Sequence, residues 1–253
     1  MSKLSSETIF HFANRVSLLG ILENDFYPHW SVENFDFVGA GMPMVIPLLC
    51  FCDIPLGQIH EHINDYGKYG IGMKKEWANK NKLNPVLYME NNSALSELFT
   101  KTLNQVSEEI ESIRELGMLI DSQKEMMNKL IKMLQYCKQF EGRFSKGSIN
   151  KDKKFYNERE WRYVPDIVDT SVKYLLLPIK DYIEPLKTEL NRQIQTKKLT
   201  FSPSDINYLI IEEENDRIQF INEIDRIKAK YSDDDRKILK SKILSSRQIF
   251  EDF

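Results

Sequence analysis

The chain has 253 residues, and its 35 lysine and arginine residues against 38 aspartate and glutamate residues give a formal net charge of −3. Hydrophobic residues make up 42% and charged residues 29%, a composition that argues against a disordered chain and is typical of a globular protein with a sizeable core. The near-neutral charge also argues against a dedicated nucleic-acid scaffold, which carries a basic excess.

The first forty residues predict a strand, a helix and an irregular stretch. Residues 7–12 (ETIFHF) form a short run of β-prone residues. Asn14 is a suitable N-cap for an amphipathic helix, whose apolar positions are Val16, Leu18, Leu19, Ile21 and Leu22. Residues 26–41 are rich in aromatic residues, glycine and asparagine, and we expect them to be irregular.

A nearly continuous apolar run follows at 44–54 (MVIPLLCFCDI), as in a strand buried on both faces. Pro47 is expected to break the hydrogen-bond ladder, which limits the predicted strand to 48–52. The glycines at 70 and 72 match no phosphate-binding fingerprint and are expected to allow close backbone packing. The elements expected next are a short helix, a strand, a helical turn or two and a strand, at 57–66, 69–73, 74–80 and 85–89.

From Ser93 the apolar residues recur at steps of three and four, which predicts one long amphipathic helix or two helices hinged near Gly117. We interpret 93–140 as a helical insertion within a single α+β domain that spans residues 1–253. Coiled-coil dimerisation, with a homo-oligomer held together by these helices, is the alternative. The heptad register is not sustained past Gly117, which weakens that alternative.

The last third returns to mixed structure. In chain order we expect strands at 154–164 and 174–178, a helix at 181–196, a buried strand at 207–211, an amphipathic helix at 215–231, a helix capped by Ser232 and a last strand at 246–253. These short strands do not alternate cleanly with helices, as a Rossmann sheet requires, so the predicted fold class is α+β.

The compartment is predicted from what the sequence lacks. No apolar run reaches the roughly 18 residues that span a bilayer, and the first residues resemble no signal peptide. The 3 cysteines cannot build a disulfide framework, and an odd number suits a reducing compartment. These features predict a cytoplasmic protein without a membrane partner.

A zinc site is one interpretation of Cys50, Cys52, His60 and His62, which are spaced C-x-C-x7-H-x-H. Residues two apart in a helix point about 200° apart, so His60 and His62 cannot both face one ion. Buried apolar cysteines and ordinary helix histidines are the favoured interpretation, and we expect no metal.

The charged run at 154–164 contains the other candidate site. On one continuous strand, Glu158, Glu160 and Arg162 would project from the same face. Two neighbouring carboxylates repel each other, so one pKa is expected to rise in a desolvated site. Such a pair can orient a sugar hydroxyl, stabilise an oxocarbenium-like centre or act on an acceptor. Residue types alone favour an edge strand with solvated, cross-paired charges, and they favour a core histidine for His11.

The order of the motifs resembles the AbiGi family of bacterial abortive phage-infection proteins. The motifs are FHF at 10–12, LLGIL at 18–22, CFCDIPL at 50–56, YGKYGIG at 66–72, KEW at 75–77, NPVLY at 84–88 and EREWR at 158–162. This resemblance covers most of the chain outside the helical insertion. It implies a role in antiphage defence, as the antitoxin of a two-gene system with a cognate toxin or antitoxin protein as partner.

A more distant resemblance joins the opening HFAN…LLGIL to ADP-ribosyltransferases of the DarT kind. It implies a split β core and NAD as substrate, with His11 matching the first-strand histidine and Glu160 the late catalytic glutamate. Glu158 matches the first glutamate of the E-x-E pair of some members, although these begin with arginine rather than histidine.

Under this resemblance NAD would bind between the His11 strand and the Glu158–Glu160 strand. Tyr66 or Tyr69 would stack on nicotinamide, and Arg162 or Lys154 would neutralise the pyrophosphate. Glu160 would contact the ribose 2′-hydroxyl, and Glu158 would act on an unidentified acceptor macromolecule. A non-catalytic antitoxin that binds its partner through the 93–140 helices, and a nucleotide sensor without turnover, remain alternatives.

Overall fold

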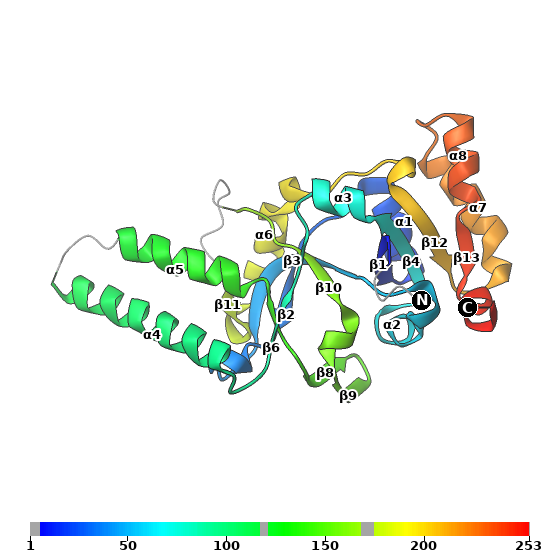
Figure 1. Ribbon diagram of the computed structural model, residues 1–253. Coiled ribbons are helices and arrows are strands. Elements are labelled where there is room, and N and C mark those ends of the chain that lie inside the picture. Colours follow the sequence, from blue (N-terminus) through cyan, green and yellow to red (C-terminus); the bar gives the residue numbers. More distant parts are fainter. Residues whose placement is uncertain (1–5, 117–120, 168–174, 253) are drawn as a thin grey trace.

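The computed structural model describes residues 6–116, 121–167 and 175–252, and these form a mixed α+β fold around a nine-stranded sheet (Figure 1). The central path of the sheet runs β13-β12-β4-β1-β3-β10-β5, with β2 and β11 also paired to β3. The strands are β1 (Thr8–Ala13), β2 (His29–Glu33), β3 (Met44–Cys52), β4 (Tyr69–Lys74), β5 (Asn84–Pro85), β10 (Glu160–Tyr163), β11 (Leu177–Pro178), β12 (Ile206–Ile211) and β13 (Ile243–Ser245).

Two small sheets and the helices complete the described part of the chain. The strands β6 (Leu87–Met89) and β7 (Cys137–Gln139) pair in parallel, and β8 (Gly142–Lys146) and β9 (Ile149–Lys153) form a hairpin. The helices are α1 (Arg15–Asn24), α2 (His60–Tyr66), α3 (Lys75–Lys80), α4 (Ala94–Glu115), α5 (Asp121–Leu134), α6 (Leu186–Gln193), α7 (Arg217–Ile227), α8 (Asp233–Lys240) and α9 (Ser246–Asp252). Within the described residues, no helix is both long and apolar enough to cross a membrane.

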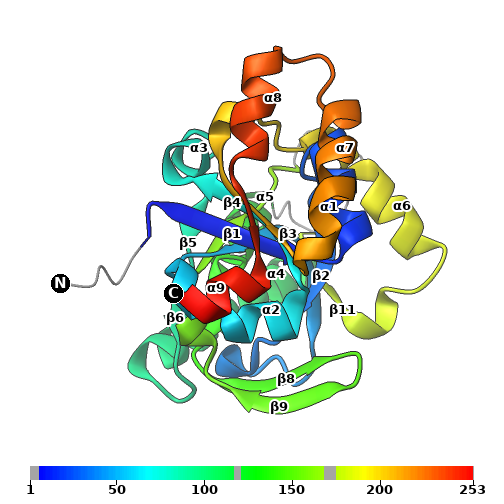
Figure 2. The same cartoon turned by 90° about the vertical axis from the view of Figure 1, so that its right-hand side faces the viewer.

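Helices cover both faces of the sheet. On one face α1, α3, α7 and α8 pack against Ile9, Phe51, Ile71 and Leu209 in the largest hydrophobic cluster. On the other face α2 and α9 pack against Phe10, Phe12 and Cys52. Figure 2 shows the β8–β9 hairpin beneath α2, outside the main sheet. Both α2 and this hairpin contribute residues to the pocket described below.

The sheet is split between β1 and β3. These strands are antiparallel but share one registered pair, Phe10 with Cys52, whereas β1 pairs with β4 along all six of its residues. Nearer its N-terminus, β3 pairs with β2 instead, from Met44 to Leu48. The edge of β3 that faces β1 is therefore open between Leu48 and Cys52.

Two glycines of β4 hold the β1 side together. A Cβ at Gly70 would lie 2.8 Å from the Phe12 ring, and a Cβ at Gly72 would lie 2.8 Å from the Phe10 ring. Both rings thus cross directly over the β4 backbone, and a side chain at either glycine would displace them. The close packing expected of these glycines is confirmed.

Several predicted elements are confirmed. The Asn14 side chain accepts a hydrogen bond of 2.8 Å from the Ser17 amide and caps α1, and Ser232 caps α8 in the same way. The strands β1, β4 and β12 lie within a residue or two of the predicted ranges, as does the helix α3, and the helix predicted at 57–66 begins later, at His60, as α2. The predicted helices at 181–196 and 215–231 are present as the shorter α6 and α7.

The irregular stretch predicted at 26–41 and the break predicted at Pro47 are both wrong. β2 forms within 26–41, and β3 runs through Pro47, which is paired with Trp30. Pro47 lies between the residues that pair with β11 and those that pair with β10, where β3 changes its partner on the strand path. The missing amide hydrogen is tolerated at such a discontinuity.

The strands predicted at 154–164 and 246–253 need correction. Residues Phe155–Glu158 form a 3-10 turn, Arg159 follows with φ +45°, and only Glu160–Tyr163 is extended, as β10. The C-terminal segment is helical, because the Ser245 hydroxyl accepts the Gln248 amide hydrogen and Ile249 is buried against the α2 cluster. The predicted strand at 174–178 is reduced to β11, and Tyr174 lies outside the described residues.

The predicted insertion is a helical hairpin that projects from the body (Figure 1). Its helices α4 and α5 contact each other, and the hinge predicted near Gly117 lies outside the described residues. The boundary at 140 is wrong, because Cys137–Gln139 leaves the helix and forms β7 beside β6. Cys137 continues the apolar spacing of the helix, but its pairing with Leu87 decides the local structure.

Candidate functional site

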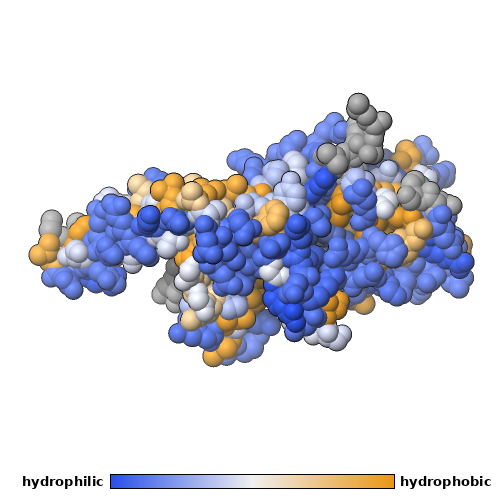
Figure 3. Space-filling model, turned by 60° about the horizontal axis from the view of Figure 1, so that its bottom comes forward, coloured by the Kyte–Doolittle hydropathy of each residue, from blue (hydrophilic) through white to orange (hydrophobic). Residues whose placement is uncertain are grey.

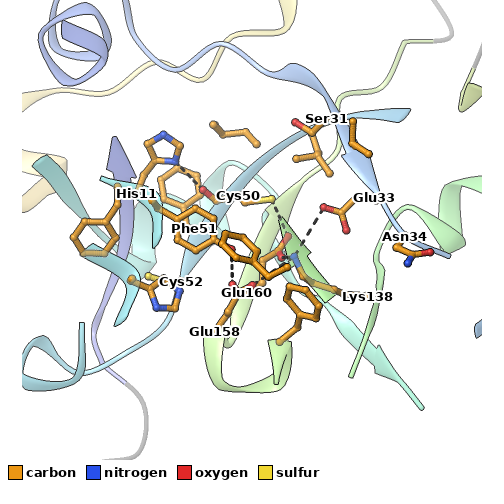
Figure 4. Close-up of a pocket in the computed structure, with 18 of the residues that line it drawn as sticks. His11, Ser31, Glu33, Asn34, Cys50, Phe51, Cys52, Lys138, Glu158 and Glu160 are labelled. Carbon is orange, nitrogen blue, oxygen red and sulfur yellow. Dashed lines mark hydrogen bonds and ion pairs between the residues drawn. The ribbon is translucent and has the colours of Figure 1, made fainter. Parts of the chain in front are cut away.

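A pocket of about 500 Å³ opens at the split between β1 and β3 (Figure 4). Its walls come from elements far apart in sequence, namely β1, β2, β3, α2, β7, the β8–β9 hairpin, the 3-10 turn at 155–158 and β10. The volume lies within the range of about 300–1,000 Å³ that small-molecule sites occupy. The next question is which of the site residues predicted from the sequence line this pocket.

A chain of ion pairs with alternating sign runs beneath the pocket. Lys138 on β7 is its centre, with its Nζ 2.7 Å from Glu160 Oε2 and 3.4 Å from Glu158 Oε2. From Glu160 the chain continues through Arg162 to Glu33, and from Glu158 through Lys153 to Asp65. Because every carboxylate has a cationic partner, these charges can be buried together without an uncompensated charge.

Glu160 lies deepest in this chain. Its Oε1 accepts hydrogen bonds from the Cys50 thiol at 2.8 Å and from Arg162 Nε at 2.7 Å, and its Oε2 accepts one from Lys138. Burial alone would raise the pKa of Glu160, but Arg162 and Lys138 outweigh burial and hold this pKa below its usual range. Glu160 is therefore ionised, with both oxygens engaged inside the protein.

Glu158 has one oxygen that is less engaged. Its Oε1 accepts hydrogen bonds from the Tyr66 hydroxyl and from Lys153, whereas among the described residues its Oε2 contacts Lys138 alone. Burial raises the pKa of Glu158, but Lys138 and Lys153 outweigh burial and lower it. The raised pKa expected from two neighbouring carboxylates is thus wrong for both, since the sequence pattern omitted the lysines.

His11 lies across the open edge of β3. Its Nδ1 donates a hydrogen bond of 2.8 Å to the Cys50 carbonyl, so Nε2 carries the free lone pair of the neutral ring. Burial lowers the pKa of His11, which keeps the ring neutral at pH 7. The ring contacts Phe26 and Phe51, so it projects from the opposite face of β1 to Phe10.

The pocket brings together four of the predicted site residues, His11, Tyr66, Glu158 and Glu160. The other three lie elsewhere. Tyr69 is directed away and donates a hydrogen bond of 2.6 Å to Asp216, and Lys154 lies over the Phe140 ring. Arg162 is fully buried beneath Glu160, where it cannot reach a pyrophosphate. Tyr69, Lys154 and Arg162 are therefore not among the residues that line the pocket.

Sequence analysis missed several lining residues. Lys138 was assigned to the helical insertion, and the β2 residues His29, Ser31 and Glu33 were assigned to irregular structure. The polar residues of HWSVE do alternate with apolar ones, which is a signal for a strand with one polar face. Arg143, exposed on β8, also lines the pocket and is the cation nearest to solvent among the described lining residues.

The cysteines and histidines of the zinc pattern face different partners. Cys50 contacts Glu160, whereas the Cys52 thiol donates to the Phe10 carbonyl. His60 stacks on Phe250 with a ring-centre distance of 3.7 Å, and His62 packs against Tyr66. Within the described part of the chain, no three histidine, cysteine or acidic side chains are grouped as metal ligands.

Comparisons with known proteins agree on one family. The family model described as "Putative abortive phage resistance protein AbiGi, antitoxin" matches residues 41–212. A protein named "Abortive phage resistance protein AbiGi" from Lactococcus lactis subsp. cremoris is 28% identical over 255 residues, which covers 90% of this chain and 99% of that protein. No solved structure matches. The family match begins just before β3 and ends just after β12, so it includes the carboxylates and Lys138 but not His11.

Proposed function

The chain belongs to the AbiGi family of abortive phage resistance proteins, and from this premise we propose that it binds NAD in the pocket and transfers ADP-ribose to an acceptor. One observation supports this proposal above others. His11, Tyr66, Glu158 and Glu160 are distant in sequence, yet all four line one concave pocket. A protein that only masks a partner has no need of such convergence.

The residues of the pocket fit the parts of NAD. The rings of Phe10, Phe12, Tyr66 and Phe144 provide apolar surface for the nicotinamide ring. Glu158 Oε2 can accept a hydrogen bond from a ribose hydroxyl, because Lys138 is its single contact among the described residues. The ion-paired floor has no unmatched cation, so the pyrophosphate would lie at Arg143, where the guanidinium is exposed.

The roles that we propose for the two glutamates differ from those expected from the sequence. We assign the ribose contact to Glu158, because both oxygens of Glu160 already hold protein donors. The bond between ribose C1′ and the nicotinamide nitrogen would break, with its electron pair leaving on neutral nicotinamide, and Glu158 would stabilise the oxocarbenium-like centre. An acceptor nucleophile would then bond to C1′ and release its proton to water.

NAD turnover by the purified protein tests this proposal. Glu158→Gln removes the charge and should lower turnover by about 100-fold or more. Glu108→Gln, on the exposed surface of α4, is the matched control and should leave turnover unchanged. The proposal fails if the wild-type protein shows no turnover and millimolar NAD does not raise its melting temperature, because a bound ligand must stabilise the folded state.

A second candidate function, a non-catalytic antitoxin, is favoured by the surface of the α4–α5 hairpin. Figure 3 shows hydrophobic residues along this projecting arm. Leu98, Leu116 and Met133 are 61%, 73% and 58% exposed, and a monomer seldom exposes several large apolar side chains on one such arm. If this function is the correct one, Met133→Lys should release the toxin and slow the growth of cells that carry both genes, while Glu158→Gln should leave growth unchanged.

A further inference from the structure

The β2 wall of the pocket carries polar side chains for which the proposed function has no role. His29, Ser31 and Glu33 alternate along β2, and all three line the pocket. Figure 4 shows Ser31 across the pocket from Glu158, with Glu33 between them in contact with Lys138. Alternate residues of a strand are about 6.6 Å apart, so the row is about 13 Å long. That length is sufficient for more than one ring of a ligand.

Two members of this row have side chains without a hydrogen-bond partner in the described part of the chain. Among the described residues, the His29 ring and the Ser31 hydroxyl make no side-chain hydrogen bond, in contrast to the fully paired carboxylates on the opposite wall. Polar groups that line a cavity without a protein partner are satisfied by water or by a ligand. The row therefore offers free donors and acceptors to whatever occupies this end of the pocket.

The chemistry of the row favours an uncharged ligand group. Desolvation lowers the pKa of His29, so its ring is neutral at pH 7 and both donates and accepts hydrogen bonds. The Glu33 charge is matched by Arg162 at 3.1 Å, which leaves no surplus positive charge for a phosphate. Leu48, which pairs with His29, lines the pocket beside that ring and provides an apolar surface for a flat ring.

We propose that the β2 row is the subsite for the adenosine half of the dinucleotide, with Ser31 and His29 hydrogen-bonded to ribose hydroxyls or to the edge of the base. This assignment rests on the proposed function, because it places nicotinamide beside Glu158 at the other end of the pocket. It gives NAD a direction in the site: the pyrophosphate passes Arg143, and the adenosine lies along β2 against Leu48.

Titration calorimetry with two half-ligands tests the subsite. Adenosine monophosphate (AMP) probes the β2 row, and nicotinamide mononucleotide (NMN) probes the Glu158 end. Ser31→Ala should weaken AMP binding by about three- to ten-fold, the effect of one lost hydrogen bond, and should leave NMN binding within about two-fold. Ser31→Thr keeps the hydroxyl and should restore most of the AMP affinity.

Ser145→Ala is the matched control, since Ser145 lines the pocket on the β8–β9 hairpin and is exposed. It should change neither affinity. The subsite is overturned, with the proposed function intact, if the wild-type protein binds NMN but not AMP, or if Ser145→Ala weakens AMP binding as much as Ser31→Ala does. If the wild-type protein binds neither half-ligand, the proposed function fails together with the subsite.

Discussion

Glu158 and Glu160 are each held by two or more protein donors, whereas His29 and Ser31 on the facing wall have no side-chain hydrogen bond among the described residues. The carboxylate wall is buried and joins β7, β9, β10 and α2 through ion pairs, so the fold depends on it. The β2 strand is held by its pairing with β3, but the His29 and Ser31 side chains add no hydrogen bond to the fold among the described residues. We therefore expect changes to the carboxylates and their partners to lower the stability of the fold, and changes to His29 or Ser31 to lower the affinity for a ligand. The following variants test this difference.

Lys138→Met should have the largest effect on stability. It leaves Glu158 and Glu160 as neighbouring buried carboxylates with one shared cation removed, so the free energy of unfolding should fall by about 3–5 kcal/mol. Urea denaturation measures the change. Lys129→Met, in an exposed pair with Glu125, is the control and should cost less than about 0.5 kcal/mol. A loss below about 1 kcal/mol for Lys138→Met would show that the carboxylate wall is not essential to the fold.

His62, on the carboxylate wall, should make stability depend on pH. Burial lowers its pKa from 6.5 to about 4 in the folded protein. Because the unfolded chain binds the proton first, the stabilisation is present above pH 6.5 and is lost as the pH falls toward 4, by about 3 kcal/mol. The lowered pKa values of Glu158 and Glu160 add a further loss below about pH 4.5.

Melting temperatures between pH 7 and 4 measure this dependence. In His62→Gln the decline between pH 6.5 and 4 should be clearly shallower than in the wild-type protein, because the variant has no imidazole to titrate. His60→Gln, on the same helix and stacked on Phe250, is the control and should keep the wild-type slope. Equal slopes for the wild-type protein and His62→Gln would contradict the prediction.

Arg143→Ala should affect affinity rather than stability. Its guanidinium is exposed and pairs with the exposed Asp152, so the fold should lose less than about 1 kcal/mol. If the pyrophosphate lies beside it, NAD should bind about ten-fold more weakly, and the difference should shrink at high salt. Calorimetry at two salt concentrations measures both effects. If Arg143→Ala does not change the affinity for NAD, the pyrophosphate does not bind at Arg143.

Ser31→Ala should have the smallest effect on the fold. The hydroxyl has no protein partner among the described residues, so removing it should change the free energy of unfolding by less than about 0.5 kcal/mol. Urea denaturation under the conditions used for Lys138→Met makes the comparison direct. A loss of 2 kcal/mol or more would place Ser31 among the structural residues and would end the distinction between the two walls.

Local signals in the sequence predicted much of the fold. The Asn14 and Ser232 caps, the β4 glycines and the apolar spacing of α4 and α5 are all properties of neighbouring residues, and each is confirmed. The errors arose where distant segments decide the local structure. Cys137 fits the helical pattern but forms a strand because it pairs with β6. Similarly, β3 continues through Pro47 because it pairs with β2.

The candidate site was predictable as a set of residues but not as an arrangement. His11, Tyr66, Glu158 and Glu160 were identified from their types and from family resemblance, and they meet in the pocket. Their protonation was predictable only in part: Arg162, which lowers the pKa of Glu160 most, lies on the same strand, but Lys138 and Lys153, which lower the pKa of Glu158, come from β7 and β9. A buried charge cannot be understood from its own segment when its partners lie on other segments.

The parallel pairing of β6 and β7 has a consequence for how the chain can vary. Parallel neighbours need a long crossover connection, and the α4–α5 hairpin provides it. The position of Lys138 is fixed by its pairing with Tyr88, not by the length of the hairpin. Because closing a longer loop costs little extra entropy, the arm can be lengthened, shortened by whole turns or exchanged for a foreign helical hairpin. The lysine between the two carboxylates would keep its place, so the arm is a natural point at which to graft a tag or a sensor onto this protein.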